Sequence, residues 1–274
     1  YTGDGTTSHA INGVGFQQDW VWIKRRNNAN GHFLNDSVRG ATKDLESNST
    51  DAETTNNQYG ILKSFDNDGF TVSVGSSNGA RANTSGGTFV GWCWKAGTSV
   101  SGTTTGSGTG QSYTGSANTD AGFSIIAYTG NGTAGHTIPH HLGVAPKMVI
   151  SKKRSSTGSW GTYHAGLTSA SYYILLNDSA AQASNTVYFN GTAPTDSVVT
   201  RGTGADGNAD GVTYIQYSFA EIEGYSRITS YVGNASTDGT FCYLGHRPAW
   251  IMLVGLPILN QMIYFRHLYT SSTL

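Results

Sequence analysis

Residues of the types that bind metals or catalyse reactions are few in this chain, and residues 206–211, DGNADG, are the most suggestive group. Asp206, Asn208 and Asp210 stand at alternate positions before a glycine, as at the start of a calcium loop. The twelfth position of such a loop needs an acidic side chain, and Tyr217 stands there. A polar hairpin turn is therefore preferred, and the three residues remain the candidate metal ligands.

Histidine and cysteine offer no clearer site. His136 is followed by His140 and His141, so it is either a metal ligand with one of them or a structural hydrogen-bonding residue at a strand entry. No HExxH, CxxC or His-x-His spacing occurs, which favours the structural role. Cys93 and Cys242 form neither a disulfide framework nor a zinc pattern. Cys93 lies in an apolar segment and is expected as a buried free thiol.

One passage of the sequence occurs three times, which gives an internal control on these candidates. It begins at Tyr1 as YTGDGTTSHAINGVG, at Tyr128 as YTGNGTAGHTIPHHLG and at Tyr231 as YVGNASTDGTFCYLG. The copies start 127 and 103 residues apart, so each is one small domain and not a short solenoid repeat. An active site copied with its domain would keep its reactive residues, whereas a scaffold would keep only its pattern.

The comparison of the copies favours a scaffold. Asp19 in the first copy is matched by Lys147 in the second, and Cys93 is matched by Ser218. Glycine, tyrosine and the apolar alternation persist. The polar features that persist are the pair His9 and His136 and the basic strand ends KRR and SKKR. We therefore predict no enzyme activity, no catalytic residue and no cofactor.

The composition predicts an all-β protein. Of 274 residues, 37 are glycine and 11% are aromatic, and only 12% are charged against about 25% in ordinary domains. Short apolar runs such as GFTVSV, YYILL and TVYF alternate with Gly, Asn and Asp, which is the pattern of short strands and turns. We expect tandem antiparallel β-sandwich units.

The copies divide the chain into four segments. Residues 1–97 are expected to form a first sandwich unit that lacks its opening strand, and residues 122–225 a second unit. Residues 98–121 are so rich in Gly, Ser and Thr that they predict a flexible linker, or an extended arm on a neighbour. Residues 226–274 comprise an incomplete third unit and a divergent apolar tail. The chain is therefore expected to be a fragment of a longer protein, or to exchange its surplus strands with another chain.

The strand that closes the first unit predicts which side chains form the core. Val90, Trp92 and Trp94 alternate with Gly91 and Cys93, so the two sets lie on opposite faces. The Val/Trp/Trp row is expected in the core, and the Gly/Cys row is expected to face outward or toward a partner. The earlier strand DWVWIK is apolar on both faces, which predicts burial on both sides, inside a sandwich or under a neighbouring chain.

Charge and hydropathy argue against two classes of partner. The net charge is −1, so the chain has no global field that would attract nucleic acid or an anionic membrane. No apolar run approaches the roughly 18 residues of a membrane span. We expect neither nucleic acid nor a membrane as a partner.

Several segments together resemble a known family. GFQQDWVWIKRR, NDSVRG, FDNDGF, FVGWCWKAG, GFSIIAYTGNGT and RPAWIML are similar to a repeated domain of structural proteins in tailed bacteriophages, often marine ones. The resemblance covers both units and the start of the third, up to Leu253, although the second unit lacks DSVRG and the double-Trp ending. It implies jelly-roll or concanavalin-like sandwiches in a fibre, an appendage or a capsid decoration, and it supplies no catalytic residue.

The expected function is that of a non-enzymatic virion structural protein on the extracellular phage particle, and contact with the host surface is one expected role. The expected partners are copies of itself, as a trimer by analogy with phage fibres, other virion proteins and a host surface glycan. A lectin-like, carbohydrate-binding adhesin module is the alternative.

Glycan binding would need an exposed aromatic platform, since sugar rings stack on aromatic side chains. Trp160 follows a Ser/Gly loop in STGSWGTYH, with Tyr163 and His164 close behind it. These three residues are the candidate ligand-binding residues. The alternative is that Trp160 begins the next strand and packs inward.

Overall fold

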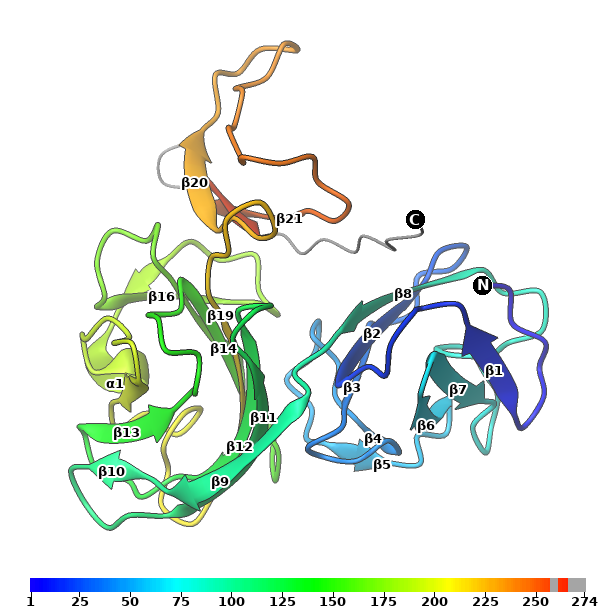
Figure 1. The fold of residues 1–274 in the computed structure, drawn as a ribbon, viewed down its shortest axis with the longest axis horizontal. Helices are drawn as coiled ribbons and strands as arrows, with labels where there is room; N and C mark the ends of the chain where they lie inside the picture. Colours follow the sequence, from blue (N-terminus) through cyan, green and yellow to red (C-terminus); the bar gives the residue numbers. More distant parts are fainter. Residues whose placement is uncertain (257–260, 266–274) are drawn as a thin grey trace.

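The computed structural model describes residues 1–256 and 261–265, which fold almost entirely into antiparallel β-structure. Figure 1 shows two β lobes side by side, built from the N-terminal part and the middle of the chain, with a smaller C-terminal module beside them. Within the described ranges the only helix is α1 (Thr186–Phe189), a single turn. These residues are the run TVYF, so its prediction as a strand is wrong. The side chain of the N-cap Asn185 accepts a hydrogen bond from the Val187 N–H, and Asn190 ends the turn in the left-handed conformation. The prediction of an all-β, antiparallel protein is confirmed.

The first unit, residues 1–97, packs two three-stranded sheets against each other. One sheet has the order β1 (His9–Asn12), β7 (Gly69–Ser73), β6 (Ile61–Asp66), and the other β3 (Phe33–Asp36), β2 (Trp20–Arg25), β8 (Phe89–Trp94). Two short strands, β4 (Lys43–Asp44) and β5 (Thr54–Thr55), pair with each other. The core between the sheets includes Val21, Ile23, Phe70, Val72 and Cys93. Cys93 is the buried free thiol that the sequence predicts.

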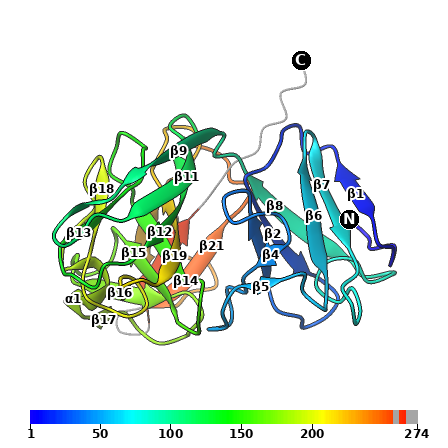
Figure 2. The same ribbon diagram turned by 90° about the horizontal axis from the view of Figure 1, so that it is seen from below.

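The second unit, residues 98–225, is built on an eight-stranded sheet. Its order is β17 (Ala183–Ser184), β16 (Tyr172–Leu175), β15 (Trp160–His164), β14 (Met148–Lys153), β19 (Thr213–Phe219), β12 (Phe123–Thr129), β11 (Ser112–Asn118), β9 (Thr98–Thr103). A smaller sheet, β10 (Thr105–Gly106), β13 (His136–Pro139), β18 (Val198–Arg201), forms the other layer (Figure 2). Buried clusters around Tyr128 and Tyr214, and around Val149 and Phe189, fill the space between the layers.

The repeat in the sequence is also a repeat in strand pairing. β1 pairs with β7 as β13 pairs with β18, and β2 lies between β3 and β8 as β14 lies between β15 and β19. Trp22 stands opposite Trp92 in the first unit, and Ile150 stands opposite Tyr217 in the second. The two units therefore share one backbone scaffold.

Residues 98–121 are strands of the second unit, so the prediction of a flexible linker or arm is wrong. β9 pairs with β11, and β11 pairs with β12, at one edge of the large sheet. Tyr113 and Ala117 of β11 are buried. A Cβ at Gly115 would lie 2.3 Å from the Ile125 carbonyl oxygen, so glycine lets the two backbones approach closely. Threonine and small residues thus build a packed edge, which composition alone does not distinguish from a linker.

The prediction for the two faces of β8 is wrong for the Gly/Cys row, which was expected to face outward or toward a partner and instead faces the core of the first unit. Trp94 of the other row is buried as expected, but at the contact between the two units. Phe89 and Cys93 point into the core of the first unit. Trp94 points out of that core toward the second unit, and Trp92 and Trp94 both contact Trp250 of the C-terminal module. Alternation tells which residues share a face, but here both faces are covered, so it does not tell which face is the internal one.

The C-terminal module contains β20 (Thr229–Val232), β22 (Gln261–Phe265) and β21 (Met252–Leu256) in that sheet order. By sequence β20 matches β12, but it pairs with β22 and so does not reproduce the pairing of the second unit. The loop between β20 and β21 exposes Phe241 and Tyr243. Part of the predicted apolar tail, 257–260 and 266–274, lies outside the described residues. No helix of the described ranges is long and apolar enough to cross a membrane.

Candidate functional site

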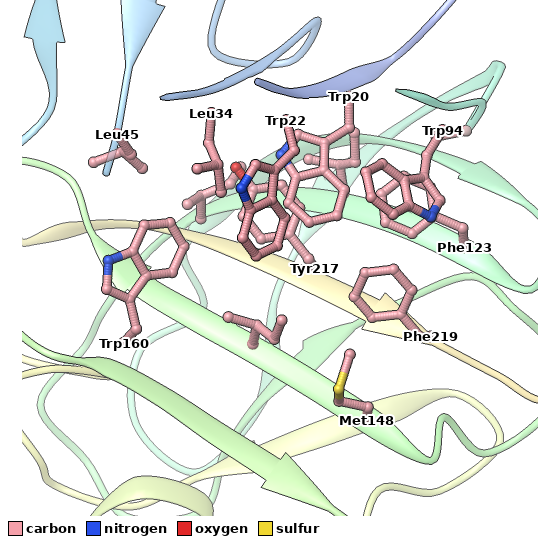
Figure 3. Close-up of a cluster of buried hydrophobic side chains, with 14 of the residues drawn as sticks. Trp20, Trp22, Leu34, Leu45, Trp94, Phe123, Met148, Trp160, Tyr217 and Phe219 are labelled. Atoms are coloured by element: carbon pink, nitrogen blue, oxygen red, sulfur yellow. The ribbon is translucent and has the colours of Figure 1, made fainter. Parts of the chain in front are cut away.

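An aromatic cluster joins the two units (Figure 3). Trp20 of the first unit stacks on Tyr217 of the second, with ring centroids 4.5 Å apart and planes 18° apart. Val21 and Ile23 face the core of the first unit, whereas Trp20 and Trp22 face the second unit. The predicted burial of this strand on both faces is confirmed, and the cover on the outer face comes from the same chain.

Ion pairs and hydrogen bonds surround this cluster. Arg154 donates from Nε and Nη2 to the two carboxylate oxygens of Glu53, at 2.9 and 3.1 Å. The Tyr217 hydroxyl donates to the Asp36 carboxylate at 2.6 Å, and the same carboxylate pairs with buried Arg39. Since Glu53, Asp36 and Arg39 belong to the first unit, these contacts fix its position against the second.

Trp160, Tyr163 and His164 do not form an exposed platform, so that prediction is wrong. Trp160 is 0% exposed, and its Nε1–H donates to the carbonyl oxygens of Glu46 (2.8 Å) and Ser49 (3.0 Å) in the first unit. Tyr163 packs in the core of the second unit and His164 is 1% exposed. The physical reason is that Trp160 begins β15, whose outer face the first unit covers. The alternative, that Trp160 packs inward, is confirmed.

The predicted calcium ligands do not converge on one point. Asn208 is 0% exposed, its Oδ1 accepts a hydrogen bond from the Asn131 N–H at 3.1 Å, and its amide donates to two backbone carbonyls. Asp206 instead pairs with Lys153 at 3.4 Å, and Asp210 is exposed. In the described part of the chain, no group of three His, Cys, Asp or Glu side chains could hold a metal ion.

The histidine that persists between the copies has a structural role, as the spacing favoured. His136 Nδ1 lies 2.7 Å from Asn208 Oδ1, and its Nε2 lies 2.6 Å from the Thr104 hydroxyl. His9 Nδ1 lies 2.9 Å from Asn83 Oδ1 in the first unit. In each unit this His–Asn clamp (His9 with Asn83, His136 with Asn208) joins the first repeated strand to the loop before the closing strand.

A cleft of about 850 Å³ lies where the first unit, the second unit and the C-terminal module meet. The first unit contributes Trp22 and Trp92, the second Leu176 and Asp178, and the module Trp250. The Trp92 ring centroid lies 6.2 Å from that of Trp22 and 6.2 Å from that of Trp250. The sequence does not reveal this site, because segments far apart in the chain build it. The alternating tryptophans of β2 and β8 were its one visible sign.

The polar wall of the cleft includes His32, Asn48 and Asp178. The Trp22 Nε1–H donates to His32 Nδ1 at 2.7 Å, so the neutral imidazole carries its proton on Nε2. Burial, together with the nearby Lys24 ammonium, lowers the pKa of His32 to about 4 and keeps the ring neutral at neutral pH. The Asn48 Oδ1 accepts the His32 backbone N–H at 2.7 Å, which leaves the Asn48 amide N–H groups to donate. This arrangement suits binding of a neutral ligand.

The model of one protein family, described as a domain of unknown function (DUF7483), matches residues 1–264 of the chain. No curated protein and no solved structure matches the chain. The matched range includes the first unit, the second unit and most of the C-terminal module. The chain therefore belongs to the DUF7483 family.

Proposed function

We propose that this protein is a non-enzymatic structural component of a tailed-phage particle, in a fibre, an appendage or a capsid decoration, with jelly-roll or concanavalin-like sandwiches as its units. The observation that carries the proposal is the continuous contact between the two units. Trp20 stacks on Tyr217 across it, and Glu53 pairs with Arg154 beside it. A chain joined in this way acts as one display body or spacer, the role that the resemblance to phage structural domains implies.

The chemistry of the cleft supports binding and not catalysis. Hydrolysis of a glycoside needs two carboxyl groups on opposite sides of the scissile bond, and Asp178 is the single carboxylate that lines the cleft within the described residues. The Nδ1 of His32 already accepts the indole N–H of Trp22. Neither an acid–base pair nor an activated nucleophile follows from these groups.

The exposed side chains of the C-terminal module support protein partners on the particle. Phe241 is 85% exposed, Tyr243 76% and Leu253 50%, all in one module, whereas the aromatic residues of the first and second units are buried or half-buried. Copies of this chain, as a trimer, and other virion proteins are the proposed partners. Exchange of strands between copies of the chain is part of this proposal.

Immunogold electron microscopy of intact particles tests the proposed location. An antibody raised against the purified chain is applied to particles of a phage that encodes it. Gold at regular positions on the tail or the capsid is the expected result. Particles without label, from lysates in which the same antibody detects the soluble chain, would refute the proposal. Label on uninfected bacteria would favour the lectin-like adhesin.

A further inference from the structure

We infer that the cleft binds one ring of a neutral hexopyranose glycan, with C–H groups of the sugar against Trp92 and Trp250 and its hydroxyl groups toward Asp178, Asn48 and His32. This assigns a ligand class to a site formed by three parts of the chain. Its biological setting, a contact with the host surface, rests on the proposed function, whereas the binding itself is a property of the isolated protein.

The aromatic wall of the cleft leaves indole surface accessible, whereas other tryptophans at the contact between the units are covered. Trp92 and Trp250 are half-buried, whereas Trp20 and Trp94 are each 1% exposed. In the second unit the equivalent of Trp92 is Tyr217, which is 0% exposed because the first unit lies over it. Flat indole surface at the border of a cleft suits a ring that is apolar on one face and polar at its edge.

The polar wall supplies both donors and acceptors. Asp178 accepts the Ala180 N–H through Oδ1 at 3.0 Å, which orients the carboxylate and leaves Oδ2 as an acceptor. The Nε2–H of His32 and the amide of Asn48 supply donors, because Nδ1 of the one and Oδ1 of the other are already engaged. Sugar hydroxyls donate and accept at once, so they match such a mixed wall.

The charged and polar groups that line the cleft distinguish a neutral glycan from acidic and from purely apolar ligands. Among the lining residues, all in the described part of the chain, Asp178 is the one charged group, and neither lysine nor arginine is present. An acidic sugar would meet a carboxylate without a cation to offset it. A purely apolar ligand would cover the polar wall and leave its hydrogen bonds unmade. A neutral glycan avoids both penalties.

NMR titration of the complete chain with methyl glucoside, methyl galactoside and methyl mannoside tests the inference. The six tryptophans give six indole N–H signals, so shifts of these signals show directly which tryptophans a ligand contacts. At least one glycoside is expected to shift the Trp22, Trp92 and Trp250 signals, with a dissociation constant on the order of 1 mM for a single ring. Cyclohexanol and glucuronic acid, the apolar and acidic comparators, are expected to bind at least about tenfold more weakly.

Two variants and one control locate the binding. Trp250→Ala is expected to weaken binding about tenfold or more, and Asp178→Asn, which keeps the shape of the side chain, severalfold. The matched control is Tyr243→Ala, an exposed aromatic residue of the same module outside the cleft lining, with unchanged binding.

Each contrary outcome overturns the inference. These are no shift by any of the three glycosides up to about 50 mM, shifts that Trp250→Ala and Asp178→Asn leave unchanged, or preferential binding of cyclohexanol or glucuronic acid. Particle labelling tests the proposed function and glycan titration tests this inference, and the result of one does not depend on the result of the other. A labelled particle with an empty cleft refutes only this inference, and a cleft that binds in a chain absent from particles refutes only the proposed function.

Discussion

The first unit fills its core with apolar side chains at positions where the second unit buries a polar cluster. In the first unit Val72 lies opposite His9, and Ile23 lies opposite Gly91. A Cβ at Gly91 would lie 3.0 Å from Cζ of Phe70, so the phenylalanine ring occupies the space above the glycine. This core needs no hydrogen bond among these side chains.

The second unit holds Arg201, Ser151 and Gln216 at the positions of Val72, Ile23 and Gly91. Arg201 is 0% exposed, and its Nη2 donates to the Ser151 hydroxyl at 2.6 Å and to the Gln216 side-chain oxygen. Its guanidinium also lies over the rings of two aromatic residues of the core, Tyr128 and Phe189. Nε and Nη1 have no hydrogen-bond partner in the described structure.

The scaffold of the two units does not depend on how this part of the core is filled. Both units keep the His–Asn clamp and the same pairing of strands, while the side chains between the layers exchange apolar for polar chemistry. In the second unit Val199 stands where Phe70 stands in the first, and the smaller side chain leaves room for the guanidinium. The pairing of strands and the His–Asn clamp are therefore common to the two units, whereas the chemistry of this part of the core differs.

Trp160→Ala, which removes a side chain from the contact between the two units, is expected to have the largest effect on stability. The substitution removes a fully buried indole and leaves two carbonyl oxygens of the first unit without their donor. We expect a loss of about 4 kcal/mol in the free energy of unfolding, measured by urea denaturation. Tyr243→Ala, at an exposed position, serves as the control and should change it by less than about 0.5 kcal/mol. A Trp160→Ala protein as stable as the control would show that the interface contributes little.

The polar core of the second unit can be tested by removing one partner and then both. Gln216→Leu alone leaves the Arg201 guanidinium without one of its two acceptors, and we expect it to cost about 3 kcal/mol. Adding Arg201→Met makes this part of the core apolar, as in the first unit, and should restore most of the loss. Urea midpoints of the single and double variants measure both effects. A double variant less stable than Gln216→Leu would mean that the arginine stabilises the core by itself.

The features of the fold that depend on local pattern could be predicted from the sequence. The apolar runs GFTVSV and YYILL are strands as predicted, whereas the run TVYF is the helix α1. The apolar residues on both faces of DWVWIK predicted a strand buried on both sides. The absence of a metal-binding spacing around His136 favoured a structural hydrogen bond, and His136 Nδ1 contacts Asn208 Oδ1. Each of these predictions uses only neighbouring residues or the repeat.

What failed depends on neighbours that the sequence does not name. The Trp row of β8 and the Phe/Cys row are both apolar, so nothing local distinguishes the internal face from the face that meets another unit. Trp160 follows a loop and looks exposed, yet the partner that covers it comes from Glu46 and Ser49, more than a hundred residues away. The cleft was missed for the same reason, since Trp22, Trp92 and Trp250 meet only after three parts of the chain assemble.

We expect a smaller effect on stability in the core of the first unit, where Gly91 and Phe70 lie close together. Gly91→Ala places a methyl group 3.0 Å from the Phe70 ring, and we expect a loss of about 1–2 kcal/mol. In a Phe70→Val background, which copies Val199 of the second unit, the same substitution should cost about 1 kcal/mol less. A double-mutant cycle in urea measures this coupling. Additive losses would show that Phe70 and Gly91 do not compensate each other.

The smallest effect expected concerns the His–Asn clamp and pH. Burial lowers the pKa of His136, opposed by its hydrogen bond to Asn208 and reinforced by the Arg201 charge. The unfolded chain therefore binds a proton that the folded chain does not, so stability is complete above the ordinary histidine pKa of about 6.5 and falls as the pH drops below it. We expect the free energy of unfolding to decrease between pH 7 and pH 5.5 because of this group. His136→Gln, which keeps a polar side chain beside Asn208, should flatten that part of the stability–pH curve. The matched variant His9→Gln removes the equivalent contact with Asn83 in the first unit and measures the effect of losing that contact. An unchanged curve in His136→Gln would assign the acid sensitivity to other buried groups, such as His140, whose pKa burial also lowers.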